Sequence, residues 1–276
     1  MMGYGISYGA ISVVNAIPCG IGSTIGIELK TISEFIPGGT GKNVNIVNDP
    51  SEDDTMARLC VESALNCIGV ELKGWTLTVR SEIPVSRGLK SSSSACNSII
   101  SAVLNEFGQK MKAVDMIRIG VNCARSACVT VTGAFDDACG CHLGGLVVTD
   151  NSKDELLGHY DIKDYDVVIH VPERRIRKHS LSKEMFAPVS GRAAELVKLL
   201  PDGVLNVMTE NGSLISGVVG ENGIMAKIAL KRGALAAGIS GTGPATAMLV
   251  EKGKGKGLAD DIGDCIFTTT RRKVNG

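Results

Sequence analysis

The stretch Pro84-Val-Ser-Arg-Gly88-Leu-Lys-Ser91-Ser-Ser-Ser94-Ala95 lies between a predicted strand and a predicted helix. Apolar and polar side chains alternate over residues 75–83, as in a half-buried strand. Over residues 99–107 apolar side chains recur at spacings of three and four, as in a helix. The first turn of a helix offers unpaired N–H groups and the positive end of the helix dipole, so it favours an anion. The unit therefore predicts a phosphate-binding loop.

Individual residues of this stretch suit that role. Gly88 permits a tight turn and a close approach of the backbone to a ligand, and Lys90 adds a positive charge. The serines can cap the helix, bind phosphate oxygens or help to hold Mg²⁺. The alternative is a plain capping loop, because the stretch is not a Walker motif. The nearest match to that motif, residues 36–43, has Ile36 and Asn43 in place of the required glycine and hydroxyl residue.

Two adjacent acids, Asp136 and Asp137, interrupt the apolar, glycine-rich segment 132–139. Burying a charge is unfavourable, so the pair indicates either a solvated turn or a functional site. In the functional interpretation one acid accepts the proton of a hydroxyl group, as an Asp commonly does in kinases.

Composition limits the class of protein. The chain has 276 residues, 44% of them hydrophobic, which is enough for one large or two modest domains. Its 29 basic and 29 acidic residues leave no net charge for attraction to nucleic acid or an anionic membrane, so we expect neither partner. No basic residue precedes the first apolar stretch, so we expect no secretory signal. The nine cysteines are interpreted as buried thiols in a reducing cytosol. We expect a cytoplasmic monomer or homodimer.

Patterns along the rest of the chain mix strands and helices without a steady βαβ alternation, which favours an α+β fold. Helices are predicted at residues 52–69, 113–128, 191–200, 203–219, 222–234 and 257–263. Further strands are predicted within residues 4–30 and at 146–149, 166–171, 245–251 and 265–274. The polar stretch 151–161 suggests a domain boundary, with domains at 1–153 and 154–276.

Three segments together resemble the GHMP kinase superfamily. Residues 84–95, PVSRGLKSSSSA, resemble its loop PxxxGLGSSxx, and Lys90 in place of the second Gly is similar to the archaeal type of shikimate kinase. Residues 8–29, YGAISVVNAIPCGIGSTIGIEL, resemble the first motif, and residues 238–249, GISGTGPATAML, the third. The first motif commonly carries a Lys or Arg, whereas this chain has none between Met1 and Glu28.

The resemblance implies a two-domain fold, with an N-terminal domain like ribosomal protein S5, a ferredoxin-like C-terminal domain and the site in the cleft between them. It implies an ATP- and Mg²⁺-dependent kinase that phosphorylates the 3-hydroxyl of shikimate, a step toward chorismate and the aromatic amino acids. The alternatives are homoserine kinase, another GHMP small-molecule kinase, or a GHMP-fold sensor without catalysis.

The resemblance also implies roles for named residues. The ATP phosphates would contact Pro84, Val85, Ser86, Arg87, Gly88, Leu89, Lys90, Ser91, Ser92, Ser93 and Ser94. Ser92 would take part in catalysis by helping to coordinate Mg²⁺. The galactokinase-like pattern GxxDQ makes Asp136 the catalytic base, with Asp137 as the alternative or as a contact for Mg²⁺ or substrate. The acceptor would contact Asn15, Gly241, Thr242, Gly243 and Arg271.

The carboxylate of shikimate calls for an Arg, whose planar fork matches a carboxylate at two points. The candidates are Arg87, Arg125, Arg271 and Arg272. The basic run at residues 174–178 is either a solvated loop or a lid over the phosphates.

Overall fold

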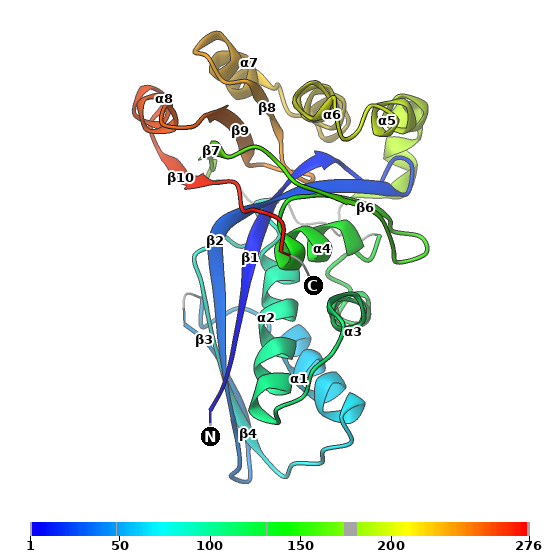
Figure 1. Ribbon diagram of the computed structural model, residues 1–276, viewed down its shortest axis with the longest axis vertical. Coiled ribbons are helices and arrows are strands. Elements are labelled where there is room, and N and C mark those ends of the chain that lie inside the picture. Colours follow the sequence, from blue (N-terminus) through cyan, green and yellow to red (C-terminus); the bar gives the residue numbers. More distant parts are fainter. Residues whose placement is uncertain (1, 48, 131, 174–180, 275–276) are drawn as a thin grey trace.

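The computed structural model describes residues 2–47, 49–130, 132–173 and 181–274. Within these residues the strands form two sheets, which follow one another along the long axis of the molecule (Figure 1). The first sheet has the strand order β3-β4-β2-β5-β6, with β1 paired to β2. Its strands are β1 (Gly3–Val14), β2 (Ile21–Pro37), β3 (Lys42–Ile46), β4 (Trp75–Ser81), β5 (Leu146–Asp150) and β6 (Glu155–Tyr160).

The long strand β2 organises the first sheet, because residues 31–37 pair with β4, residues 21–25 pair with β5, and β1 pairs with it in addition. Helices cover one face of this sheet (Figure 1). They are α1 (Thr55–Cys67), α2 (Ser91–Glu106), α3 (Ala113–Ser126) and α4 (Phe135–Leu143). All four helices contribute to one apolar cluster with Phe35 and Trp75 of the sheet, and this core holds α2 and α4 in place.

The second sheet has the order β10-β7-β9-β8, and all its neighbouring strands are antiparallel. Its strands are β7 (Tyr165–His170), β8 (Ala236–Ile239), β9 (Thr246–Glu251) and β10 (Cys265–Thr269). Its helices are the 3₁₀ helix η2 (Lys183–Val189), α5 (Ser190–Val197), α6 (Val204–Val219), α7 (Ile224–Lys231) and α8 (Gly255–Ile262). Helices precede β8 and follow β9, so the element order and strand order are those of a ferredoxin-like domain.

The two sheets are joined by a shared apolar cluster and not by a flexible linker. Ile11 and Ile25 of the first sheet belong to the same buried cluster as Val167 and Leu249 of the second. The C-terminal segment then returns from β10 toward α4, where the backbone N–H of Val274 donates to the carbonyl of Leu143 (Figure 1). Buried contacts of this kind fix how the two domains face each other.

The structure confirms the predicted α+β class and most of the predicted elements. It adds β3, β6, β8, α4 and the 3₁₀ helix η2, which the sequence patterns did not predict. β6 lies within the stretch that suggested a domain boundary, yet it pairs with β5 in the first sheet. The change of sheet therefore falls between Tyr160 and Tyr165, beyond the predicted end of the first domain at residue 153, because a backbone can pair with a neighbouring strand whatever its polarity.

Among the described residues, no helix combines the length and the apolar character needed to cross a bilayer. The basic run at residues 174–178, predicted as a solvated loop or a lid, lies outside the described residues.

Candidate active site

A cavity of about 560 Å³ opens where the two domains meet, and we call it the active-site cavity. It is lined by parts of five segments that are far apart in the sequence, namely residues 12–17, 51–53, 85–93, 128–137 and 241–243. The first turns of α2 and α4 both contribute to its wall, so two helix N-termini border one space. Such termini favour anions, and the volume is that of a small-molecule site.

The predicted phosphate loop forms one wall of the active-site cavity. The residues of the loop that line it are Val85, Ser86, Gly88, Lys90, Ser91, Ser92 and Ser93. Four other residues that were predicted to contact phosphate, Pro84, Arg87, Leu89 and Ser94, do not line it. Leu89 and Ser94 are fully buried behind the loop, and Arg87 donates to the carbonyl of Glu173. The loop therefore presents only part of its residues to the cavity, and the others pack against the protein.

Gly88 is the point where the phosphate loop touches the glycine-rich turn of the second domain. Its φ is +83°, and a Cβ there would lie 2.0 Å from the carbonyl oxygen of Ser240. The hydroxyl of Ser240 donates to the carbonyl of Gly88 at 2.8 Å. Only glycine combines this backbone conformation with so close an approach.

Lys90 brings three of the sequence motifs together. Its Nζ lies 2.8 Å from Oδ1 of Asp137 and donates to Oγ of Ser12 at 2.8 Å. The same Ser12 oxygen accepts from the backbone N–H of Gly241 at 2.9 Å. Among the described residues that line the cavity, Lys90 alone is a Lys or Arg. Lys90, at the position that departs from the superfamily pattern, thus places a cation of the phosphate loop beside Ser12 of the N-terminal motif.

Asp136 and Asp137 lie in the first turn of α4, and they are 4% and 6% exposed. Oδ1 of Asp136 accepts from Nδ2 of Asn151 at 2.7 Å, while Asp137 pairs with Lys90. Burial and the nearby charge of Asp137 raise the pKa of Asp136 to about 6, although Lys90 and the Asn151 hydrogen bond oppose the rise. The solvated-turn interpretation of this pair is therefore wrong, and the two acids have different partners.

Gly22 of β2 makes room for Asp136. A Cβ at this position would lie 2.4 Å from Oδ2 of Asp136, so any larger residue would displace the carboxylate. Sequence reasoning missed both Gly22 and Asn151. Asn151 lies outside the three motifs, and Gly22 lies within the first one, residues 8–29, but nothing in that motif points to Asp136.

The residues that were predicted to contact the acceptor fall into two groups. Asn15, Gly241, Thr242 and Gly243 all line the active-site cavity. The backbone of Asn15 is held from the second domain, because its N–H donates to Oδ1 of Asn211 on α6 at 3.1 Å.

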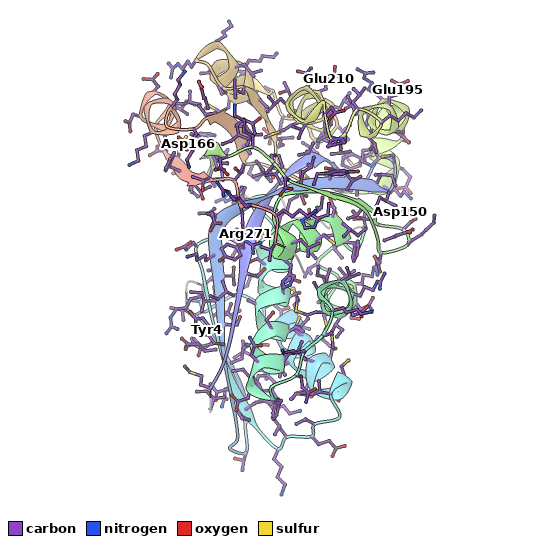
Figure 2. All side chains as sticks on the ribbon, in the orientation of Figure 1. Tyr4, Asp150, Asp166, Glu195, Glu210 and Arg271 are labelled. Carbon is purple, nitrogen blue, oxygen red and sulfur yellow. The ribbon has the colours of Figure 1, made fainter. Side chains whose placement is uncertain are left out.

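Arg271, which was also predicted to contact the acceptor, does not line the active-site cavity. Figure 2 labels its position in the molecule. Arg271 lines a different surface pocket, its guanidinium lies 4.0 Å from the ring centre of Tyr8, and it donates to the carbonyl of His142. The strand β10 ends at Thr269, so Arg271 belongs to the returning C-terminal segment and not to a strand beside the cavity.

The other arginines considered for a carboxylate also point elsewhere. Both terminal nitrogens of Arg125 bind Asp154, at 2.6 and 2.7 Å. Arg272 binds Asp164 in the same two-point manner. Their forks are occupied by protein carboxylates, and neither residue lines the active-site cavity.

Comparison with known proteins gives consistent matches. Residues 54–145 match the family described as GHMP kinases N terminal domain. The shikimate kinase of Methanothrix thermoacetophila is 40% identical over 255 residues, which cover 91% of this chain and 86% of that protein. The shikimate kinase of Pyrococcus furiosus is 34% identical over 275 residues, which cover 98% and 100% of the two chains.

Solved structures show the same fold at low sequence identity. The mevalonate kinase of Methanococcus jannaschii has a TM-score of 0.76 at 16% identity, covering 100% of this chain and 98% of that one. A homoserine kinase from Cytophaga hutchinsonii has a TM-score of 0.74 at 16% identity, covering 98% and 95%. These structures share the two-domain architecture, whatever each one phosphorylates.

Proposed function

Because the chain belongs to the archaeal type of shikimate kinases within the GHMP kinases, we propose that it transfers the γ-phosphoryl group of ATP to the 3-hydroxyl of shikimate. The product feeds chorismate and aromatic amino-acid synthesis. The observation that carries the proposal is that a phosphate-binding helix terminus and a buried pair of carboxylates line one cavity. Phosphoryl transfer needs these two features side by side, since one holds the donor and the other receives a proton from the acceptor.

The phosphate loop would hold the donor. The N–H groups of the first turn of α2 have no partners within the helix, so they can donate to phosphate oxygens, with hydroxyls from Ser91, Ser92 and Ser93 nearby. Lys90 would stabilise the charge of the transferring group from its buried position beside Asp137. These groups are fixed before the substrates arrive, which favours the transition state without a cost of reorganisation.

Asp136 would act as the base. It would accept the proton of the 3-hydroxyl as the oxygen forms its bond to phosphorus. A pKa of about 6 suits this role, because the carboxylate is ionised at neutral pH yet remains a better proton acceptor than an exposed Asp. Asp137 is the less suitable base, since its Oδ1 already forms an ion pair with Lys90.

The oxygen donors that line the cavity fit Mg²⁺. Ser92, Glu52 and Asp53 line the active-site cavity, and Mg²⁺ prefers hard ligands such as hydroxyl and carboxylate oxygens. Within the described residues, no group of three or more His, Cys, Asp or Glu side chains is arranged to hold a metal ion by itself. Such sites commonly rely on phosphate oxygens for the remaining ligands, and the bound ion neutralises phosphate charge.

Neutral donors would hold the acceptor. Asn15, Thr242 and the backbone of the turn at residues 241–243 line the cavity, and amide and hydroxyl groups match the vicinal hydroxyls of shikimate. We place the reaction in the cytoplasm, where the nine free cysteines would stay reduced.

A coupled assay of ADP formation tests the proposal, with shikimate, homoserine and mevalonate as acceptors in parallel reactions. We expect turnover that depends on shikimate and Mg²⁺, and its absence would reject shikimate as the substrate. Asp136→Asn should lower kcat by about 100-fold or more, the usual contribution of a general base. If Asp137→Asn abolished turnover while Asp136→Asn kept it, the base would be Asp137. Full activity in both variants would show that neither residue is the catalytic base.

A further inference from the structure

Asn151 is a buried residue that contacts Asp136 at two points. It directly follows β5 and is 2% exposed. Its Nδ2 donates to Oδ1 of Asp136 at 2.7 Å, and its Oδ1 accepts from the backbone N–H of Asp136 at 3.1 Å. We propose that Asn151 is a positioning residue, which holds the carboxylate of Asp136 in the orientation needed for proton transfer. This inference rests on the proposed role of Asp136.

The amide of Asn151 has all its hydrogen-bonding positions engaged. Besides the two contacts with Asp136, its Oδ1 accepts from Oγ1 of Thr149 at 2.7 Å and its Nδ2 donates to Oγ1 of Thr132 at 3.3 Å. An Asn side chain has two donor hydrogens and two acceptor lone pairs, and each has a partner here. A rotated amide would turn Nδ2 toward the N–H of Asp136, so only one orientation satisfies the group.

The backbone of Asn151 is also held on two sides. Its N–H donates to the carbonyl of Gly20 at 2.9 Å, at the start of β2. Its carbonyl accepts from Arg125 of α3 at 3.5 Å, and Arg125 binds Asp154 in the same turn. A side chain can orient another one only if it is itself supported, and Asn151 meets this condition.

Asp136 is restrained from the opposite side as well. Its Oδ2 lies against the backbone of Gly22, where a Cβ would come within 2.4 Å, and its own carbonyl accepts from Oγ1 of Thr24 at 2.9 Å. Asn151 and Gly22 thus limit rotation of the carboxylate in both directions. Asn151 does so with a neutral amide, while the cation Lys90 forms its ion pair with Asp137. A neutral donor orients a carboxylate and withdraws less of its basicity than a cation would.

The test compares kcat and KM of the full-length Asn151→Ala and Asn151→Asp variants with those of the parent protein, in the shikimate assay. Asn151→Asp keeps the shape of the side chain but replaces the neutral amide donor with a second carboxyl group against Oδ1 of Asp136. We expect kcat to fall by between about 10- and 100-fold, since misplacing a reacting group by about 1 Å costs about that much. The KM values for shikimate and ATP should change by less than about threefold, because the residue touches neither substrate.

A matched control is Asn97→Asp. Asn97 is fully buried in α2, and its Nδ2 donates at 2.9 Å to the carbonyl of Ala138 in α4, the helix that also carries Asp136. The same chemical change there should lower the melting temperature to a similar extent but change kcat by less than about threefold. If the Asn151 variants lost no more kcat than this control at equal loss of thermal stability, the role would be structural only and the proposal would be overturned.

A double-mutant cycle gives a second readout. In an Asp136→Asn background, adding Asn151→Ala should change the residual kcat by less than about threefold, because the group that it orients is gone. A further loss equal to that in the parent protein would show that Asn151 does not act through Asp136. Absence of turnover in the parent protein itself would instead reject the proposed function, and the Asn151 proposal with it.

Discussion

Replacing Lys90 by Met removes the cation between Asp137 and Ser12 but keeps a side chain of similar length in the buried space. The lysine and aspartate side chains are 5% and 9% exposed, so water cannot take the place of the lost cation. Unit charges 2.8 Å apart attract by about 6 kcal/mol at an effective dielectric constant of about 20. Desolvation of Lys90 offsets part of this energy. Removing one partner of a buried pair therefore should lower the free energy of unfolding by about 3–5 kcal/mol.

Urea denaturation measures this loss, and the protein provides its own probe. Trp75 is the single tryptophan, it is fully buried in the first sheet, and its fluorescence should report unfolding of the domain that holds Lys90. The comparison is made between free energies extrapolated to water at one pH.

Two controls make the comparison specific. Lys42 and Glu62 form an ion pair with the same 2.8 Å separation but with side chains that are 45% and 38% exposed, so Lys42→Met should cost less than about 1 kcal/mol. The double variant Lys90→Met/Asp137→Asn no longer leaves the Asp137 carboxylate without its ion-pair partner and should regain about 2 kcal/mol or more of the loss. If Lys90→Met cost no more than Lys42→Met, the reasoning from burial would be refuted.

Three further predictions follow from the site. The kcat/KM for shikimate should fall as the pH drops through about 6, because Asp136 becomes protonated. Asp137→Asn should move this limb of the pH–kcat/KM profile to lower pH, since the charge of Asp137 contributes to the raised pKa of Asp136. Gly88→Ala should raise the KM for ATP by about 10-fold or more, because the new Cβ would lie 2.0 Å from the carbonyl oxygen of Ser240 and would push the two domains apart. An unchanged KM for ATP would show that this contact can relax. Arg271→Met should lower the melting temperature by a few degrees, because its contacts with the Tyr8 ring and the His142 carbonyl are lost, but the KM for shikimate should stay within about twofold. A large rise in this KM would instead indicate that Arg271 contacts the substrate.

Most of the fold could be predicted because its elements carry strong local patterns. Residues 75–83 alternate, and β4 occupies residues 75–81 of that range. The stripe at residues 99–107 falls on α2 up to Glu106, with Phe107 as the residue that caps its C-terminus, and α2 begins earlier, at Ser91. The missed elements have weak patterns: β3 is a short edge strand of mostly polar residues, and α4 combines acids, cysteines and a glycine. Their conformations depend on the neighbours that they pack against, and periodicity does not report those neighbours.

Some residues of the candidate site could be predicted from the sequence, and others could not. The phosphate loop, the acid pair, Asn15 and the glycine-rich turn could be located because each belongs to a motif of the chain, and all of these segments line the active-site cavity. Arg271 was misplaced because a basic residue near the end of a predicted strand gives no sign of which pocket it faces. Asn151 and Gly22 were missed because their roles lie entirely in contacts with Asp136.

By itself the sequence determined the class of fold, the order of the three motifs and the kind of chemistry, since backbone propensity, hydrophobic spacing and side-chain type are local properties of the chain. Only the tertiary structure decided which groups meet. Lys90 contacts Ser12 and Asp137 across sequence separations of 78 and 47 positions. Asp136 in α4 is bonded to Asn151, which directly follows β5. The position of each buried charge is set by packing, because a charge removed from water is stable only where the fold supplies its partner.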